Sequence, residues 1–416
     1  MTSALLKTNT TVSRGERAIM LLGGLPAALA LMALASVLPK IDAALAHTPH
    51  DSFLVKQLIG AVGLAMVVGA PVAGLIVNRI GLRNLIVGAL LIYVAAGTAG
   101  LYLSDLPALL VSRLCVGLVA ASLQIMAITL ISVRYGDSER AKWMGRHIGC
   151  AMIGTIFLHP VAGMLGDINW RGPFVLYATA LLLLPAAFNC QRKLHNLNEV
   201  PAAETTTPIK TSPTASPQNS SSTSRFPWHY LLFGMLLGGI AYLPMVYAPY
   251  LLRQNGISSS TVMSLVLTAD SLAGASMAMF FGRARKRLSH YEAFAISLAC
   301  SGCGALIAVT AHNVVGVIVG LLIYGLGIGW FTPNLMTALA GKVSPLHQAR
   351  AAGFVKGAHF LSAPLFITIA EPVARKYGPV GAMWMIVVLA FTLLVVCLLR
   401  NRSNKLTFTP AEEAVP

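Results

Sequence analysis

The sequence has 416 residues, of which 56% are hydrophobic and 11% charged, and its mean hydropathy is +0.73. A soluble globular protein carries about 25% charged residues, so the composition excludes that class and indicates a chain that crosses a lipid bilayer several times. The formal net charge of +16 does not require nucleic acid as a partner, because net charge describes fields and solubility and membrane topology accounts for it below.

No set of side chains points to catalysis or to a bound metal. The six cysteines are scattered, and Cys300 and Cys303 form a Cys-x-x-Cys pair inside an apolar stretch, where we interpret them as small membrane-helix residues rather than a redox or metal pair. No His, Cys or carboxylate cluster has metal-ligand spacing, and no nucleophile is paired with a base. We therefore expect no catalytic residues, no metal, no cofactor and no enzyme activity.

A window of about 20 residues predicts twelve membrane-spanning helices. The first follows the basic residues Lys7, Arg14 and Arg17 and is long enough to span, so we interpret it as a retained helix rather than a signal peptide. The predicted spans are residues 18–38, 53–77, 84–103, 107–133, 144–166, 173–190, 229–252, 260–281, 291–310, 314–340, 351–372 and 379–399.

Between the sixth and seventh spans, residues 191–228 are rich in Ser, Thr and Pro. A segment of this composition cannot build a hydrophobic core, so we expect a disordered cytoplasmic linker. The sequence thus predicts an all-α membrane protein of two pseudo-symmetric six-helix bundles, residues 18–190 and 229–400. Cytoplasmic tails are expected at residues 1–17 and 401–416.

A faint repeat relates the two predicted bundles. Shifting the sequence by 208 residues, half its length, gives five identities in the 29 positions that begin at Gly117, and these include Gly117 on Gly325 and Thr129 on Thr337. In both stretches a helix is followed by a basic loop. Internal repeats of this kind are typical of secondary transporters.

Lysine and arginine are distributed unevenly between the predicted loops. With both termini in the cytoplasm, 22 of the 30 fall in cytoplasmic segments and six in outer segments, while Arg113 and Lys356 lie within spans. The positive-inside rule therefore places both termini in the cytoplasm. We expect a multi-pass protein of a bacterial-type inner membrane, with the lipid bilayer and not nucleic acid as its surroundings.

The loop between the second and third predicted spans carries a specific motif. Its sequence, Gly74-Leu-Ile-Val-Asn78-Arg79-Ile-Gly81-Leu-Arg83, resembles the G-x-L-x-D-R-x-G-R loop of the major facilitator superfamily. In that family the aspartate helps to latch the two halves on the cytoplasmic side, and the resemblance implies a gating role for these five residues. Asn78 stands in the place of the aspartate, so it can hydrogen-bond but cannot form the ion pair.

Two further elements resemble those of the family's twelve-helix drug:proton antiporters. Arg113-Leu-Cys-Val-Gly117 resembles the R-x-x-x-G element of helix four, which the family associates with proton transfer. The fifth helix keeps only Pro160 and Gly163 of the exporters' G-x-x-x-G-P-x-x-G-G pattern. The resemblance, which covers about residues 15–400, implies a twelve-helix transporter and proton coupling at Arg113. Arg113 also lies on an otherwise uncharged span, where a charge is a functional-site candidate.

Asp270 is the acidic residue nearest the middle of a predicted span. Burial away from water favours the neutral form of a carboxyl group, so we expect Asp270 to carry a coupling proton; the alternative is an ion pair with a cation such as Lys356. His159 and His359 lie in apolar helices and are candidate proton relays, or are satisfied by backbone carbonyls. Glu371, near an outer helix end, is expected to be interfacial.

Proline, glycine and aromatic residues cluster in the seventh and tenth predicted helices. Interrupted helices at corresponding places of two transporter halves indicate substrate sites and hinges, although Gly and Pro are common in membrane helices generally. We expect a substrate to contact aromatic and hydrogen-bonding side chains in and around these helices: Met32, Gln124, Tyr242, Tyr247, Trp330 and Asn334.

Together these features predict a monomeric, proton-coupled exporter of small amphipathic organic compounds that works by alternating access. One alternative is an importer of a small organic anion, with Arg113 and Lys356 as its charge partners. Another is a membrane sensor that binds a ligand without moving it. The substrate itself is not readable from the sequence.

Overall fold

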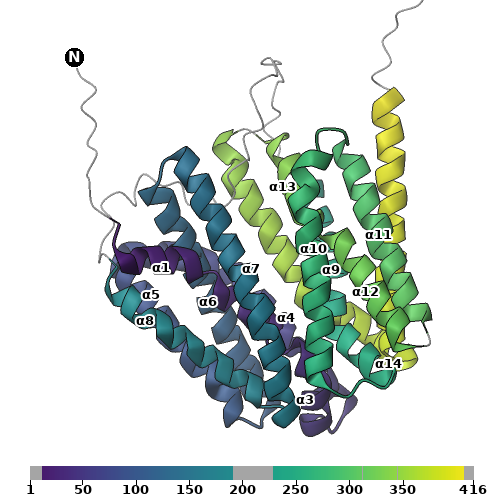
Figure 1. Ribbon diagram of the computed structural model, residues 1–416, viewed down its shortest axis with the longest axis horizontal. Helices are drawn as coiled ribbons and strands as arrows, with labels where there is room; N and C mark the ends of the chain where they lie inside the picture. The colour runs from purple at the N-terminus through teal and green to yellow at the C-terminus, as the bar shows by residue number, and fades with distance from the viewer. Residues whose placement is uncertain (1–11, 191–227, 312, 344, 407–416) are drawn as a thin grey trace, which may run out of the picture.

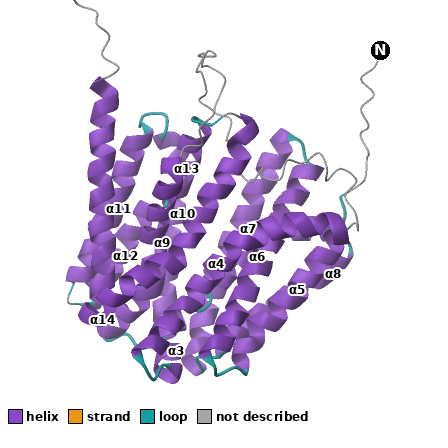
Figure 2. Ribbon diagram, turned by 180° about the vertical axis from the view of Figure 1, so that it is seen from behind, coloured by secondary structure: helices purple, strands orange, loops and turns teal. Residues whose placement is uncertain are grey.

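The computed structural model describes residues 12–190, 228–311, 313–343 and 345–406. The described chain is helical throughout, without strands (Figure 2). The predicted linker lies outside the described residues, apart from its last position. The first half contains α1 Arg14–Leu22, α2 Leu25–Met32, η1 Ala35–Val37, α3 Leu38–Leu45, α4 Pro49–Ile80, α5 Leu82–Thr98, η2 Ala99–Leu101, α6 Leu106–Arg134, α7 Asp137–Ile168, η3 Gly172–Leu183 and α8 Leu184–Phe188.

The second half contains fewer and longer helices. They are α9 Trp228–Gln254, α10 Ser260–Ala284, α11 His290–Thr310, α12 Val314–Ile328, α13 Phe331–Ala340 and α14 Pro345–Leu406.

The helices agree with twelve membrane crossings. Ten helical stretches in the described chain are long and apolar enough to span a membrane. The stretch at residues 350–402 accounts for two crossings, because Gly378 breaks α14 with a positive φ of 70°. The shorter apolar helix Gly172–Phe188 supplies the remaining one. The all-α architecture of two six-helix bundles predicted from the sequence is therefore confirmed.

Helix ends follow the local sequence. Thr48 caps α4 and Ser289 caps α11, and each forms a reciprocal pair of hydrogen bonds with the acidic residue three positions later, Asp51 and Glu292; this arrangement satisfies backbone donors that a helix start leaves free. The helix α4 ends at Ile80 and is followed by Gly81, whose φ of 83° favours a residue without a side chain. The turn between the second and third crossings therefore depends on a glycine of the predicted loop motif.

Helix seven differs from its prediction. The sequence predicts an interruption there, but α9 is continuous through Pro244 and Pro249. Pro244 has no N–H to bond the carbonyl of Ile240, and the hydroxyl of Tyr324 on α12 donates to that carbonyl at 2.6 Å. A neighbouring helix thus satisfies the backbone group that the proline leaves free, and the prediction of a broken helix is wrong here.

The first and tenth crossings are broken instead. In the first crossing, α1 ends at Leu22 and α2 begins at Leu25, with Gly23 and Gly24 between them. A Cβ at Gly23 would lie 2.7 Å from the Cβ of Ala127 on α6, so close helix contact coincides with the break. The tenth crossing changes from α12 to α13 at Gly329 and Trp330, as the sequence predicts.

Two helix crossings, one in each half, are related by the same 208-residue shift as the sequence repeat. A Cβ at Gly117 on α6 would lie 2.4 Å from the carbonyl oxygen of Val62 on α4, and a Cβ at Gly325 on α12 would lie 2.3 Å from that of Asp270 on α10. Both members of the second pair are 208 residues after those of the first. Equivalent helices therefore cross at equivalent small residues, which is how membrane helices approach closely.

The two halves meet closely at one end of the molecule, where α3 and the break in α14 lie (Figure 1). A Cβ at Gly60 on α4 would lie 3.0 Å from Pro364 Cα on α14, and one at Gly163 on α7 would lie 2.2 Å from Ser264 Oγ on α10. We call this the closed end; it includes residues 39–60, 163–167, 253–264 and 364–378.

At the opposite end the halves are not in such contact. A Cβ built at Gly145 or Gly149 on α7, or at Gly353 on α14, would meet no atom of the described chain within 4 Å. Four residues further along α14, the Cβ of Gly357 would lie 3.7 Å from a methyl group of Val67 on α4. The halves thus separate toward this end, which we call the open end; it includes residues 74–84, 134–149, 283–290 and 341–353.

Candidate functional site

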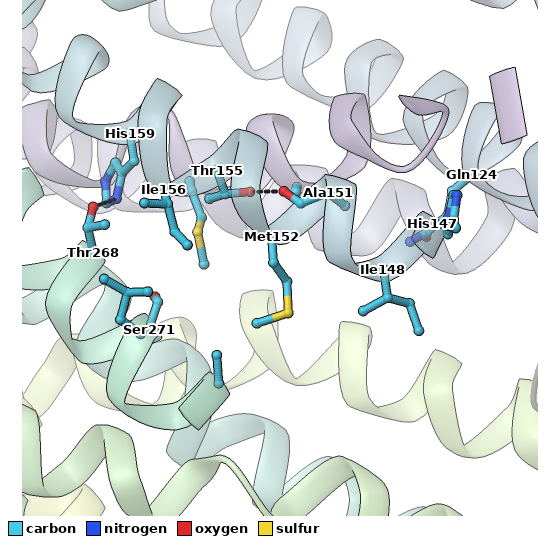
Figure 3. A pocket seen from close by; sticks show the side chains of 14 residues that line it. Gln124, His147, Ile148, Ala151, Met152, Thr155, Ile156, His159, Thr268 and Ser271 are labelled. Carbon is cyan, nitrogen blue, oxygen red and sulfur yellow. Dashed lines mark hydrogen bonds between the residues drawn. The ribbon is translucent and has the colours of Figure 1, made fainter. Parts of the chain in front are cut away.

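A cavity of about 250 Å³ lies between the halves (Figure 3). Its walls come from α2, α6 and α7 of the first half and from α10 of the second. Six of its side chains are polar, and none of the fourteen is an acid, a lysine or an arginine. The lining residues are Ala28, Met32, Gln124, His147, Ile148, Ala151, Met152, Thr155, Ile156, His159, Thr268, Ser271, Leu272 and Ala275.

The two histidines of the cavity have assignable protons. His147 Nδ1 lies 2.7 Å from the carbonyl of Met20, which can only accept, so Nδ1 carries the proton. The hydroxyl of Thr268 donates to the Ser264 carbonyl at 2.7 Å and lies 3.2 Å from His159 Nδ1. That hydroxyl has a single proton, so His159 Nδ1 also donates.

The assignment leaves Nε2 of each histidine as an acceptor. His159 Nε2 is buried and has no hydrogen-bond partner in the described chain. Gln124 and His147 lie at one end of the cavity and His159 and Thr268 at the other (Figure 3). Between these ends the lining is mainly apolar, with the hydroxyl of Thr155 bonded within its own helix, and such a cavity suits a neutral or amphipathic molecule.

Asp270 lies beside this cavity and not on it. It shares α10 with the lining residues Thr268 and Ser271, but its own Oδ1 atom packs where a Cβ of Gly325 on α12 would be. That oxygen is buried without a hydrogen-bond partner among the described residues.

No ion pair between Asp270 and Lys356 occurs in the described structure. The lysine side chain is exposed, with Nζ 5.0 Å from the ring centre of Phe360.

Arg113 lies inside the first half, away from the cavity. Its guanidinium is fully buried and donates to the carbonyls of Ala96 and Gly97, both at 3.0 Å. Those carbonyls belong to the last turn of α5, where helix carbonyls lack intrahelical partners and a cation is stabilised. The rings of Phe174 and Tyr177 lie 5.0 and 4.8 Å from it. The structure thus gives Arg113 a packing role, and its role in proton coupling stays a prediction.

His359 and Tyr242 face each other within the second half. Their ring centres are 5.3 Å apart, and a Cβ at Gly238 on α9 would lie 3.0 Å from His359 Nδ1. The pair joins α9 to α14, and neither residue lines the cavity between the halves.

The other three predicted substrate contacts in the second half have partners of their own. Tyr247 is buried at the closed end, where its hydroxyl lies 3.4 Å from Glu371. Trp330 donates from Nε1 to the Met277 carbonyl at 2.7 Å. Asn334 is fully buried and donates to the His290 carbonyl at 2.9 Å. Trp330 and Asn334 therefore join helices of the second half.

The predicted gating loop lies at the open end. Asn78 and Arg79 are exposed, and a Cβ at Gly74 would meet no described atom within 4 Å. Arg83 lies with its guanidinium 5.4 Å from the ring centre of Phe188, which is a contact within the first half. Gly81 forms the turn of this loop, which lies where the ends of the halves are apart, and its gating role stays a prediction.

Three residues singled out from the sequence line the cavity: Met32 and Gln124, which are predicted substrate contacts, and His159, which is a predicted proton relay. Sequence reasoning misses His147, Thr155, Thr268 and Ser271. A usable signal exists in the spacing of Ser264, Thr268 and Ser271, which places three hydroxyls on one face of a helix.

Several solved structures share this fold. A nucleoside transporter superposes with a TM-score of 0.72 at 13% identity, covering 92% of this chain and 99% of that one. A D-xylose–proton symporter gives 0.71 at 13% identity, with 91% and 96% covered. The inward-open xylose transporter of E. coli gives 0.66 at 13% identity, with 91% and 94% covered. At this identity the likeness concerns the fold.

Sequence comparison identifies the protein family to which this chain belongs. A chloramphenicol resistance protein of Streptomyces lividans is 26% identical over 208 residues, which are 50% of this chain and 49% of that relative. The profile of the Major Facilitator Superfamily matches residues 20–258 and 230–416, which together cover nearly the whole chain. With twelve crossings in two halves around a shared cavity, this chain belongs to the Major Facilitator Superfamily, and it is a membrane transporter and not an enzyme.

Proposed function

We propose that this transporter is a proton-coupled exporter of small amphipathic organic compounds, working as a monomer by alternating access. The observation that carries the proposal is the cavity between the halves, which combines apolar walls with hydrogen-bonding groups and has no charged side chain among its lining residues. Such a cavity suits a neutral or amphipathic molecule better than a small organic anion. Of the two cations that the anion hypothesis requires, Arg113 is occupied with α5.

The direction of transport is supported by two observations. The partial relative from Streptomyces lividans is a chloramphenicol resistance protein, and resistance suggests removal of a compound from the cell. The excess of Lys and Arg in the loops of the open end supports, by the positive-inside rule, the proposal that this end faces the cytoplasm. The structure then corresponds to an inward-open state, ready to accept a compound from the cytoplasm or inner leaflet.

Coupling to protons is proposed to depend on Asp270. Its buried Oδ1 has no hydrogen-bond partner in the described chain, and it lies beside the cavity on the same helix as Thr268 and Ser271. His159 reaches the same stretch of α10 through Thr268. Protonation near this point would change the contact between α7 and α10, which is also a wall of the cavity.

The test is transport in proteoliposomes with a panel of neutral, cationic and anionic aromatic compounds, with and without an imposed pH gradient. We expect gradient-driven movement of neutral or cationic amphipathic compounds toward the lumen that corresponds to the outside. Uptake of organic anions in the opposite direction would support the importer instead. Saturable binding without flux of any compound would identify a sensor.

A matched pair of variants tests whether the cavity is the binding site. The hydroxyls of Thr155 and Thr392 each donate to the carbonyl four residues earlier in their own helix, but Thr155 lines the cavity and Thr392 is exposed on the far part of α14. We expect Thr155→Val to change the KM for transported compounds and Thr392→Val to leave it unchanged. Equal behaviour of the two variants would place the binding site elsewhere.

A further inference from the structure

Asp167, at the end of α7 in the first half, binds the beginning of α10 in the second half. Its carboxylate accepts hydrogen bonds from the hydroxyl of Ser259 at 2.6 Å, from the backbone N–H of Ser260 at 2.6 Å, and from the N–H and hydroxyl of Thr261 at 3.0 and 2.6 Å. The first N–H groups of a helix lack intrahelical partners and attract anions. Asp167 thus supplies an acceptor from the other half of the molecule, while Lys40 balances its charge at 2.7 Å.

A second charged contact crosses between the halves on the other side of the closed end. Lys56 on α4 donates to Glu371 on α14 at 2.8 Å, and the side chains of this pair are only 9% and 6% exposed. Arg375 and the hydroxyl of Tyr247 also lie at the Glu371 carboxylate, at 3.2 and 3.4 Å. The Lys56 ammonium lies 5.8 Å from the ring centre of Tyr247 and 5.7 Å from that of Tyr250. Separating a buried pair leaves a costly unpaired charge unless water replaces the partner.

The half-chain repeat relates these two contacts. Gly163 precedes Glu371 by 208 residues, and Lys56 precedes Ser264 by the same number. Gly163 packs against Ser264, and Glu371 pairs with Lys56. Asp167 lies one helical turn beyond Gly163. Equivalent helices of the two halves, α7 and the first part of α14, therefore each present a carboxylate to the other half, to α10 and α4 respectively.

From this reciprocal arrangement we infer that Asp167 and Glu371 form a two-point latch, which holds the closed end shut and must release at both points before that end opens. Neither residue lines the cavity between the halves, so the latch acts on the conformational equilibrium and not on the substrate. The inference requires two halves that move relative to each other, but it does not rest on the substrate, the direction or the proton coupling proposed above.

The test is the accessibility of a cysteine placed at Ala363. This residue is fully buried on α14, where a Cβ of Gly63 on α4 would lie 3.1 Å from its Cβ, so it becomes accessible when the halves part at the closed end. The Ala363→Cys variant, with the six native cysteines replaced, is labelled by a membrane-impermeant maleimide in right-side-out and inside-out vesicles. The vesicle type that permits labelling also reports which side the closed end faces.

We expect slow labelling of Ala363→Cys alone, and about fivefold or faster labelling when Asp167→Asn or Glu371→Gln is added, since conformational coupling is typically about 5–150-fold. The two substitutions are at separate sites, so in a combined variant their fold increases in labelling rate should roughly multiply. The control is Asp105→Asn, which removes a carboxylate that caps α6 by accepting from the N–H of Ala108 at 3.0 Å, a contact within one half. Labelling of the control should stay within about twofold of the parent.

A folding failure of Glu371→Gln would not decide the matter, because it leaves the Lys56 ammonium buried without its partner. The double variant Lys56→Met/Glu371→Gln removes both charges of the pair and is expected to give the same increase in labelling. If Asp167→Asn and this double variant both label at the parent rate while eluting as folded protein, the latch does not exist. The transport assays would be unaffected by that outcome.

Discussion

The closed and open ends of this transporter differ in the chemistry available to join the halves. At the closed end, Asp167 and Glu371 each reach a partner in the other half. At the open end, the loop position at which the superfamily has a latching aspartate is occupied by Asn78, which is exposed. Among the described residues, the ion pair between Lys56 and Glu371 and the contact of Asp167 with the start of α10 both join the halves at the closed end, and they stabilise a state that is closed there.

The difference also bears on how such a carrier is driven. A state that is held by charged contacts at one end requires a compensating free energy to leave it, and a ligand shifts an equilibrium only by its differential affinity for the two states. Substrate and proton binding near the middle of the molecule would have to supply that difference.

The largest effect is expected at the centre. Asp270→Asn mimics a permanently protonated carboxyl group, so the transporter should lose gradient-driven accumulation altogether while it keeps substrate binding and passive exchange. Asp270→Glu should retain part of the coupling with a shifted pH optimum. Flux in proteoliposomes under an imposed pH gradient measures both. Uphill transport by Asp270→Asn at the wild-type rate would transfer the coupling role to His159, His359 or Glu371.

A large effect is also expected where the halves are in closest contact. A side chain at Gly163 would overlap Ser264 Oγ at 2.2 Å and the Ser260 carbonyl at 2.6 Å. Overpacking of this kind costs about 1–3 kcal/mol, so Gly163→Leu should lower transport by roughly 5- to 160-fold and increase labelling of a cysteine at the closed end. Gly145→Leu, on the same helix at the open end, should not increase that labelling. Slow labelling of both variants would show that the contact at Gly163 does not seal this end.

Much of the fold could be predicted from the sequence because membrane spans are defined by long apolar stretches. The twelve predicted spans agree with the helices to within a few residues at most ends, although α7 begins at Asp137 and not at residue 144. The continuous α9 could not be predicted, because the partner of the Ile240 carbonyl is Tyr324, which is 84 residues away. Breaks and continuities of helices thus depend on neighbours that a local pattern does not contain.

The site was predictable only in part, for a related reason. Composition and helix position identify Met32, Gln124 and His159, which line the cavity. They do not show that Arg113 bonds the end of α5, nor that Lys56 pairs with Glu371 across 315 residues of sequence. A charge on an apolar helix indicates that a partner exists, but the partner follows from the docking of helices and halves.

Substitution of Arg113 tests whether contacts within one half affect the opening of the closed end. Arg113→Ala removes two hydrogen bonds to the carbonyls of Ala96 and Gly97 and the contacts with two rings. We expect it to destabilise the protein by about 2–4 kcal/mol, seen as a lower Tm in detergent, without faster labelling at the closed end. Arg113→Lys should restore only part of the stability, because a single ammonium does not reproduce the guanidinium fork. Loss of coupled transport with an unchanged Tm would instead favour the proton-coupling role that the family resemblance implies.

The smallest effect is expected from a substitution that introduces, at the open end, the carboxylate that the family motif has and this chain lacks. If the exposed amide of Asn78 weakens the contact that would close this end, then Asn78→Asp should stabilise the state in which the open end is shut and the closed end is parted. A carboxylate that pairs with a cation or a helix N-terminus of the other half at the surface contributes about 0.3–1 kcal/mol, so labelling of a cysteine at Ala363 should rise by about two- to fivefold. Asn84→Asp introduces the same charge in the same region, also at an exposed position, and should have no such effect. Because Asn78→Asp adds an attraction at one end and Asp167→Asn removes one at the other, both should shift the equilibrium in the same direction. If Asn78→Asp instead slows labelling, the charge at this position does not act on closure of the open end, and the contrast between the ends rests on Asp167 and Glu371 alone.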